Sequence, residues 1–170
     1  MTDWSTYQLG ADGDDIVIDS SEDNMLAAIR LVEQAHSQID IFSRDLDARV
    51  YNHSAFTDGI RQMITSSPRA KVRVLVIDPD YSTKHGHRLI DLARHLTSYM
   101  EIRKVHEDYA ANTEAYLTVD RRGLLHRKLA SRYEAIVNFN DPHHATTLTD
   151  HFDEVWERSK SHVDYKRLYI

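Results

Sequence analysis

Apolar residues recur along the chain at two spacings, one typical of strands and one typical of helices. Short runs rich in apolar, β-branched or aromatic residues predict six strands, in DIVIDS, QIDIFS, KVRVLVIDPD, MEIRKV, EAYLTVD and EAIVNF. Apolar residues at helical spacing predict four helices, centred on residues 25–35, 56–64, 89–96 and 145–156. Ser20 and Asp23 resemble a capping box that opens the first helix. Strands and helices therefore alternate through the first half, and strands cluster after it.

This order of elements predicts an α/β domain. KVRVLVIDPD ends in a continuous apolar run, which suggests burial on both faces, as in the middle of a parallel sheet. We expect a mixed, mostly parallel β-sheet flanked by helices on both faces, with parallel crossovers early in the chain. Phe152 and Trp156 share an apolar helix face, so core packing explains them better than base stacking. Residues 1–15 form an acidic lead that could be flexible, residues 16–159 the domain, and residues 160–170 a tail or edge element.

Composition narrows the class of protein. With 170 residues, 41% of them hydrophobic, the chain is long enough for one domain with a sizeable core and too short for two. It has no cysteine, which excludes disulfides, thiolate zinc sites and a cysteine nucleophile. We find no signal peptide pattern and no apolar run that could span a bilayer. We therefore expect a soluble, cytoplasmic protein without membrane insertion.

Charge is unevenly distributed along the chain. The net charge is −6, but residues 1–23 hold seven acidic residues and no Lys or Arg, so the remainder carries about +1. Five cations fall within twelve residues, at Arg121, Arg122, Arg127, Lys128 and Arg132. Such a cluster can bind phosphates in spite of the net charge, although a solvated loop is an equally good interpretation.

Three polar loops follow predicted strands, where the functional crevice of such a sheet lies. They span residues 43–47, 78–88 and 105–112. Four of their side chains could bind zinc or manganese or form a displaced catalytic site, namely His85, His87, His106 and Asp108. His126 is a further candidate for such a site. The alternative is an exposed polar loop, and we expect neither a metal nor a cofactor.

The succession of elements resembles the phospholipase D superfamily, and in particular its small single-motif nucleases, from about residue 16 to residue 159. The resemblance rests on AIRLVEQAHSQIDIFS, GIRQMITSSPRAKVRVLVID, MEIRKV, AYLTVD and HFDEVWERS. It implies a reaction in which one histidine attacks phosphorus and a second protonates the leaving oxygen. Because small members supply one motif per chain, it also implies a homodimer.

The catalytic motif HxKxxxxD of that superfamily matches NTEAYLTVDRRGLLHRK only in part. Asp120 matches the terminal aspartate, but Thr113 stands in place of the histidine and Ala115 in place of the lysine. Glu134 matches an acidic residue that leads the family's last strand. The resemblance therefore implies a site without its nucleophile and principal cation, in which Asp120 caps or orients structure.

These observations favour a catalytically degenerate domain that acts as a binding or regulatory module. Its ligand would be nucleic acid or another phosphate-bearing molecule, and the candidate anion contacts are Arg44, Arg121, Arg122, Arg127 and Lys128. Salt bridges to surface acids are the alternative role for these cations. Two rival functions remain, a phosphodiesterase or nuclease with a displaced histidine site, and a pure interaction domain with a protein partner.

Overall fold

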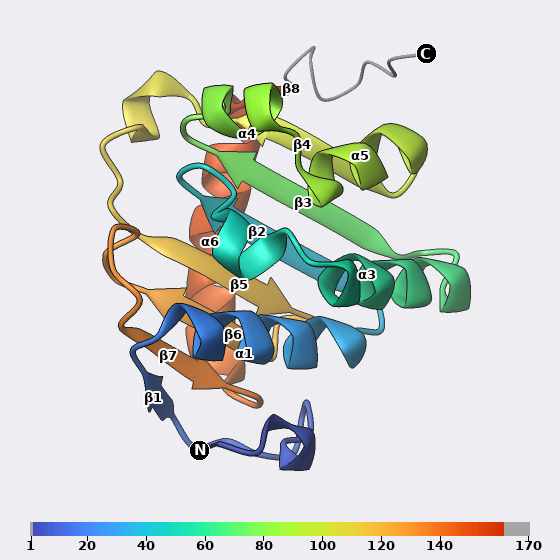
Figure 1. The fold of residues 1–170 in the computed structure, drawn as a ribbon, viewed down its shortest axis with the longest axis vertical. Helices are drawn as coiled ribbons and strands as arrows, with labels where there is room; N and C mark the ends of the chain where they lie inside the picture. Colours follow the sequence, from blue (N-terminus) through green and yellow to red (C-terminus); the bar gives the residue numbers. More distant parts are fainter. Residues whose placement is uncertain (1, 162–170) are drawn as a thin grey trace.

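An eight-stranded sheet organises residues 2–161, the part of the chain that the computed structural model describes (Figure 1). Its strand order is β1-β7-β6-β5-β2-β3-β4-β8. The strands are β1 (Ile16–Ile18), β2 (Gln38–Ser43), β3 (Lys71–Val76), β4 (Met100–Lys104), β5 (Ala115–Val119), β6 (Gly123–Arg127), β7 (Ala135–Asn138) and β8 (Lys160–Ser161).

Helices cover both faces of this sheet, and each face has its own apolar core. Figure 1 shows one set of helices in front of the sheet and α6 alone behind it. The front elements are α1 (Ser21–Glu33), α2 (Ala48–Tyr51), α3 (Ser54–Ser66), α4 (Asp80–His85) and α5 (Arg88–His95). The helix behind is α6 (Pro142–Arg158), and two short 3-10 helices are η1 (Trp4–Thr6) and η2 (Glu107–Tyr109). The Ser20 hydroxyl accepts a hydrogen bond from the Asp23 backbone N–H at 3.1 Å, which confirms the expected N-cap of α1.

The pairing of the strands confirms a mixed α/β sheet with helices on both faces, but parallel pairs do not predominate. Among the described residues, β2 pairs with β3 and β3 with β4 in parallel, as expected of the early crossovers. The other pairings, β1 with β7, β2 with β5, β4 with β8, β5 with β6 and β6 with β7, are antiparallel. The expectation of a mostly parallel sheet was wrong because short connections join β5 to β6 and β6 to β7, and a tight turn reverses the strand direction.

Strand β6 was missed by the sequence analysis, which interpreted GLLHRK as a basic connection. Leu124 packs in the core under α6, and Leu125 packs in the core on the opposite face. Both faces of this strand are therefore buried, so its apolar residues do not alternate with polar ones. With only two large apolar residues beside Arg127 and Lys128, the segment lacks the pattern that identifies a strand.

The ends of the described chain are tied to the sheet. In the acidic lead, Trp4 is buried and packs against Phe139 with ring centroids 6.4 Å apart. The Arg30 guanidinium donates to the Tyr7 carbonyl at 2.8 Å. At the other end, β8 pairs with β4, and the rest of the expected C-terminal tail, residues 162–170, lies outside the described residues.

A charged network is buried between the sheet and α6. Arg73 is 7% exposed and donates to both carboxylate oxygens of Asp40, at 2.8 and 3.1 Å. The same guanidinium lies 2.8 Å from Asp153 and packs over the Phe152 ring, 4.8 Å from its centroid. Phe152 and Trp156 are both buried, which confirms their expected place in the core. Burying a charge in this way requires such compensation, because an unpaired charge there would cost several kcal/mol.

Gly59 marks the closest approach of α3 to α1. A Cβ atom at this position would lie 2.9 Å from Val32 Cγ2 and 3.2 Å from the Glu33 backbone nitrogen. We expect Gly59→Ala to push the helices apart and lower the free energy of unfolding by about 1–2 kcal/mol, net of the gain in helix propensity. Asp58→Ala, at the exposed neighbouring position, should stay within about 0.5 kcal/mol. Urea denaturation measures both, and equal stability of the two variants would contradict this account.

Candidate functional site

The ends of five strands meet at one edge of the sheet, which we call the motif edge. The carboxyl ends of β2 and β3 lie there beside the start of β5, the end of β6 and the start of β7. The backbone N–H of Asp78 donates to the Arg44 carbonyl at 2.6 Å and joins the loops that follow β2 and β3. Ser43 Oγ accepts from the Leu46 N–H at 3.0 Å, and Leu46 has a positive φ of 64°. The loop after β2 is thus held in a tight local fold.

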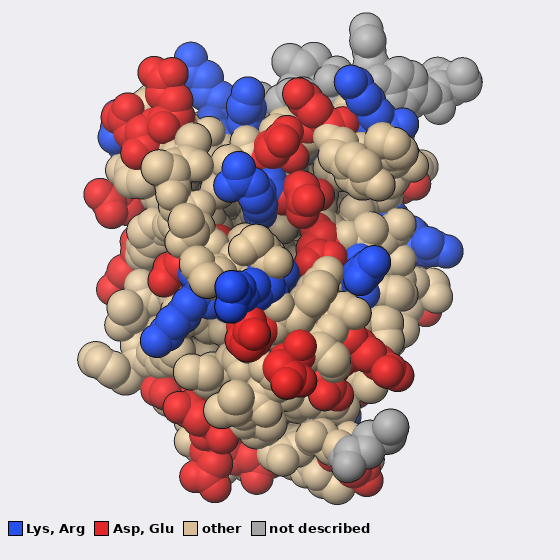
Figure 2. All heavy atoms as spheres, turned by 60° about the vertical axis from the view of Figure 1, so that its left-hand side comes forward, with Lys and Arg blue, Asp and Glu red and all other residues tan. Residues whose placement is uncertain are grey.

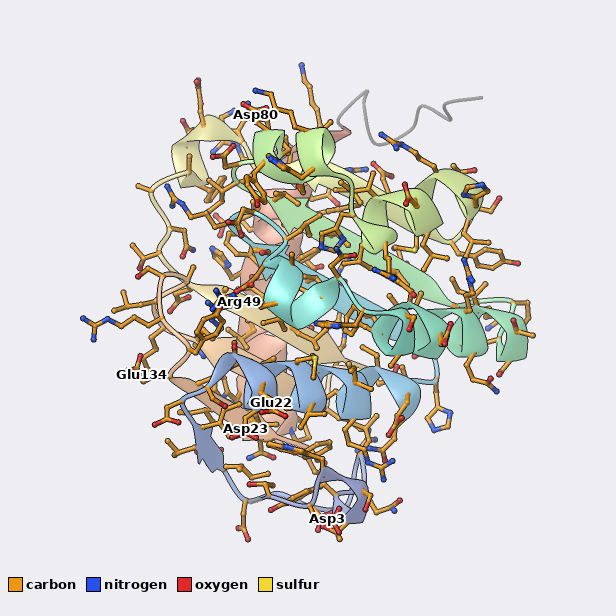
Figure 3. All side chains as sticks on the ribbon, viewed as in Figure 1. Asp3, Glu22, Asp23, Arg49, Asp80 and Glu134 are labelled. Carbon is orange, nitrogen blue, oxygen red and sulfur yellow. The ribbon has the colours of Figure 1, made fainter. Side chains whose placement is uncertain are left out.

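A pocket of about 450 Å³ opens at the motif edge. It combines the loop after β2 with the segment around α4 and the residue before Glu134, so two of the three expected loops meet in it. Its lining residues are Asp45, Asp47, Ala48, Arg49, Asn52, Tyr81, Ser82, His85, Gly86, His87 and Tyr133. Figure 3 shows Arg49, Asp80 and Glu134 along this side of the molecule.

His87 lines the pocket, but both of its ring nitrogens form hydrogen bonds with the backbone. The side chain is 3% exposed, and its Nδ1 accepts from the Leu89 N–H at 3.1 Å as the N-cap of α5. Its Nε2 therefore carries the proton and donates to the Leu46 carbonyl at 2.8 Å. Burial lowers the pKa of His87, and the contact with the Leu46 carbonyl opposes this only in part. Both ring nitrogens are occupied, so the imidazole is not free to bind a metal or a substrate.

The remaining members of the expected displaced site are spread over two places. His85 lines the pocket, and its ring stacks on that of Tyr81 with centroids 4.1 Å apart. His106 and Asp108 lie on the loop after β4, where Asp108 forms an ion pair with Arg158 at 2.7 Å. That loop lies at the same edge but does not line the pocket. Within residues 2–161, no group of three or more His, Cys, Asp or Glu side chains is placed to hold a metal ion.

Arg127 does not line the pocket, but it contacts two residues that do, Asp47 and Tyr133. It is 5% exposed, and its Nη1 donates to Asp47 at 2.9 Å. Its Nε and Nη2 donate to the carbonyls of Arg132 and Ala130, and its guanidinium lies 4.7 Å from the centroid of the Tyr133 ring. All three guanidinium nitrogens are engaged, so Arg127 presents no free cation to solvent. No signal in the sequence indicated this cluster, because the strand that ends at Arg127 was itself not predicted.

The three motif positions occupy opposite ends of β5. Thr113 is exposed at the motif edge, and its carbonyl accepts from the Ala130 N–H at 2.6 Å. Ala115 is buried and lies directly opposite Arg127 in the β5–β6 pair. Asp120 follows the far end of the strand, in the turn to β6.

Asp120 receives a set of backbone hydrogen bonds. Its carboxylate accepts from the N–H groups of His36, Ser37 and Gln38 at 2.7 to 2.8 Å, and from the Ser37 hydroxyl at 3.0 Å. Its φ of 54° is in the left-handed region, which Asp and Asn adopt more readily than most residues. The side chain thus fixes the turn from α1 into β2 against the turn from β5 into β6.

The cations expected to bind phosphate fall on two edges. Arg121 and Arg122 lie in the turn after β5, at the edge opposite the pocket, and Arg121 is 3.6 Å from Asp153. Arg44 and Lys128 are exposed at the motif edge. Arg49 and Arg132 are also exposed there, although they are not among the contacts predicted from the sequence. Figure 2 shows Lys and Arg side chains across the middle of this face, bordered by Asp and Glu.

His126 faces α6 and not the pocket, because it lies opposite Tyr116, whose side chain packs in the core under α6. Its Nδ1 is 3.0 Å from His144 Nε2, and its Nε2 is 3.5 Å from Glu114 Oε1. Burial lowers the pKa of His126, and the Glu114 carboxylate opposes that shift. The residue is therefore part of a polar cluster separate from the pocket.

The chain has a phospholipase D-like fold. It is similar to Nuc from Salmonella typhimurium, a phospholipase D family member, with a TM-score of 0.59 and 12% identity over 88% of this chain and 99% of Nuc. NucT from Helicobacter pylori gives the same values. TrmBL2, an archaeal chromatin protein whose structure shows a novel mode of DNA binding, gives a TM-score of 0.65 at 17% identity over 87% of this chain. The chain spans only 53% of TrmBL2, and at such identities the likeness establishes the fold alone.

The sequence places the chain in a more specific group. It belongs to the family described as Domain of unknown function (DUF7931), whose model matches residues 20–168. No curated protein matches it in sequence. Of the helices within residues 2–161, none has the length and apolar content needed to cross a bilayer.

The hydrogen bonds of Asp120 give a test of its structural role. We expect Asp120→Ala to lower the free energy of unfolding by about 3 kcal/mol, because it removes the acceptor of three backbone N–H groups and leaves Ala with a positive φ. Asp120→Asn should lose less, about 1–2 kcal/mol, since it keeps one acceptor oxygen. Arg122→Ala is the exposed neighbouring control. Urea denaturation compares the three, and a neutral Asp120→Ala would contradict the structural role.

The buried imidazole of His87 predicts a dependence of stability on pH. Because its folded pKa is lowered, the unfolded chain binds more protons, and stability is lost as the pH falls below about 6.5. His87→Asn retains an acceptor for the Leu89 N–H but does not titrate. We expect a smaller loss of unfolding free energy between pH 7 and pH 5 in this variant than in the wild type. Exposed His95→Asn is the control, and identical pH profiles for His87→Asn and wild type would refute the assignment.

Proposed function

We propose that this chain is a non-catalytic phospholipase D-like domain that binds a phosphate-bearing ligand, with nucleic acid as the first candidate. The observation that carries the proposal is at the motif edge. Thr113 and Ala115 stand where the resemblance puts the histidine and the lysine, and the cation beside Ala115 is neutralised by Asp47. No histidine nucleophile is therefore in place at this end of β5 to attack phosphorus, and the cation paired with Ala115 is already engaged by Asp47.

Exposed cations at the motif edge support the binding part of the proposal. Arg44, Arg49, Lys128 and Arg132 are exposed at the motif edge, and Arg49 also lines the pocket. Arginine's planar fork suits phosphate, and a local group of cations binds a polyanion even when the net charge is negative. The likeness of the fold to a DNA-binding chromatin protein and to Nuc favours nucleic acid as the first ligand to test.

The rival functions make different demands on the same site. A phosphodiesterase that used a displaced histidine in this pocket would have to use His85, because both nitrogens of His87 are occupied. A pure protein-interaction domain would need neither turnover nor phosphate affinity. The homodimer expected from small single-motif members is part of the proposal, and sedimentation velocity on the binding samples measures it.

Reversing two exposed charges at the motif edge should weaken binding. We expect Arg44→Glu with Lys128→Glu to weaken binding of a fluorescent oligonucleotide at least about tenfold at 50 mM salt. The slope of log affinity against log salt should fall by about 1.4 for a single strand or about 1.8 for a duplex. Arg69→Glu with Lys71→Glu is the matched control, since it reverses one Arg and one Lys that are exposed at the opposite edge. Fluorescence anisotropy measures all three proteins.

Two outcomes would overturn the proposal. If the wild type binds no oligonucleotide at low salt, its nucleic-acid form fails, and a protein partner becomes the better hypothesis. If a generic phosphodiester is turned over and His85→Ala abolishes the turnover, the displaced-site enzyme replaces the non-catalytic domain.

A further inference from the structure

We propose that the pocket at the motif edge takes one unpaired nucleobase, so that the ligand is single-stranded nucleic acid. This inference rests on the proposed function and names the ligand class within it. The pocket volume of about 450 Å³ falls within the range of pockets that hold small organic groups. A base in a duplex is paired and stacked, and it would have to leave the stack to enter.

An exposed aromatic pair in the pocket provides a surface on which a base can stack. Tyr81 is 58% exposed, so its side chain is accessible to a ligand. Its ring is nearly parallel to that of His85, with an interplanar angle of 21° and centroids 4.1 Å apart. His85 Nδ1 is 2.9 Å from the Tyr81 carbonyl, a contact that fixes the imidazole within the pair. Such flat surfaces bind bases of any sequence, because every base has a π-face.

The polar groups of the pocket favour a base over a phosphate. Asp45 and Asp47 line it, and their carboxylates repel phosphate but accept hydrogen bonds from the N–H groups on the edge of a base. Asp47 is already paired with Arg127, which leaves the carboxylate of exposed Asp45 as the freer acceptor. Cations lie beside these acidic residues, since Arg49 also lines the pocket and Lys128 is exposed at the same edge. The pocket and its surroundings thus offer acceptors for the edge of a base and cations for the phosphates that flank it.

The test compares three labelled ligands of equal length at 50 mM salt. They are a single-stranded DNA 12-mer, the same strand with abasic sites in place of its central bases, and the blunt duplex of the same sequence. We expect the wild type to bind the intact strand most tightly. Tyr81→Ala should weaken binding of the intact strand about tenfold, leave the abasic strand and the duplex unchanged, and be rescued by Tyr81→Trp.

His85 has a matched control elsewhere in the molecule. His95 is also exposed, and its Nδ1 lies 2.7 Å from the carbonyl of Asp91, four residues earlier. His85 makes the same kind of contact with the carbonyl of Tyr81. His95 ends α5 and lies before β4, at the edge opposite the pocket. His85→Ala should therefore weaken binding of the intact strand, whereas His95→Ala should not. Circular dichroism melts verify that these exposed substitutions leave the fold intact.

The outcomes separate this inference from the function on which it rests. Equal affinity for the three ligands, with no effect of Tyr81→Ala, would refute the base pocket while the phosphate-binding proposal stands. Loss of affinity for all three ligands on Tyr81→Ala would also refute it, because the side chain would then act on phosphate. Absence of binding by the wild type would refute both.

Discussion

The buried guanidinium of Arg127 is the constraint on which the motif edge depends. A charge with so little exposure is stable only if each of its donors is satisfied, and Arg127 meets this demand with Asp47 and two carbonyls of the loop after β6. One side chain therefore holds the loop after β2 and the loop before β7 in a fixed relation. The shape of the pocket follows from this pairing, because Asp47 and Tyr133, which line it, are both partners of Arg127.

The strongly patterned elements could be predicted from the sequence, and the contacts of individual polar residues could not. Strand β3 and helix α6 carry enough apolar residues to fix their type and the face they bury. Strand β6 was not predicted because both of its faces are buried, so apolar and polar residues do not alternate along it. At the site, the sequence indicated two of the loops that meet in the pocket, but it did not indicate the connection before β7 that supplies Tyr133. It also did not indicate that both ring nitrogens of His87 would form hydrogen bonds with the backbone of Leu46 and Leu89. The contact between His87 and Leu46 depends on how two loops pack.

The motif positions differ in their structural roles. Asp120 fixes two turns through backbone N–H groups, a task that has no connection with phosphate chemistry. Thr113 is exposed and contributes only its carbonyl to the contacts of the neighbouring loop. A chain can therefore keep the aspartate for its architecture whether or not the rest of the motif supports catalysis. This explains how a partial match can accompany a complete fold.

The packing of the acidic lead makes the distribution of charge over the molecule asymmetric. Trp4 anchors the lead beside β7, and Asp15 accepts from the Asn138 side chain at 2.8 Å, so these negative charges are held against one flank of the sheet. Asp3, Glu22 and Asp23 lie in the same lower part of the molecule, and acidic side chains gather across the lower part of the face that carries the cations (Figures 2 and 3). A polyanion on this face is repelled from the β1 flank and attracted to the centre. The acidic lead therefore forms a negative boundary on the β1 flank of the cations at the motif edge.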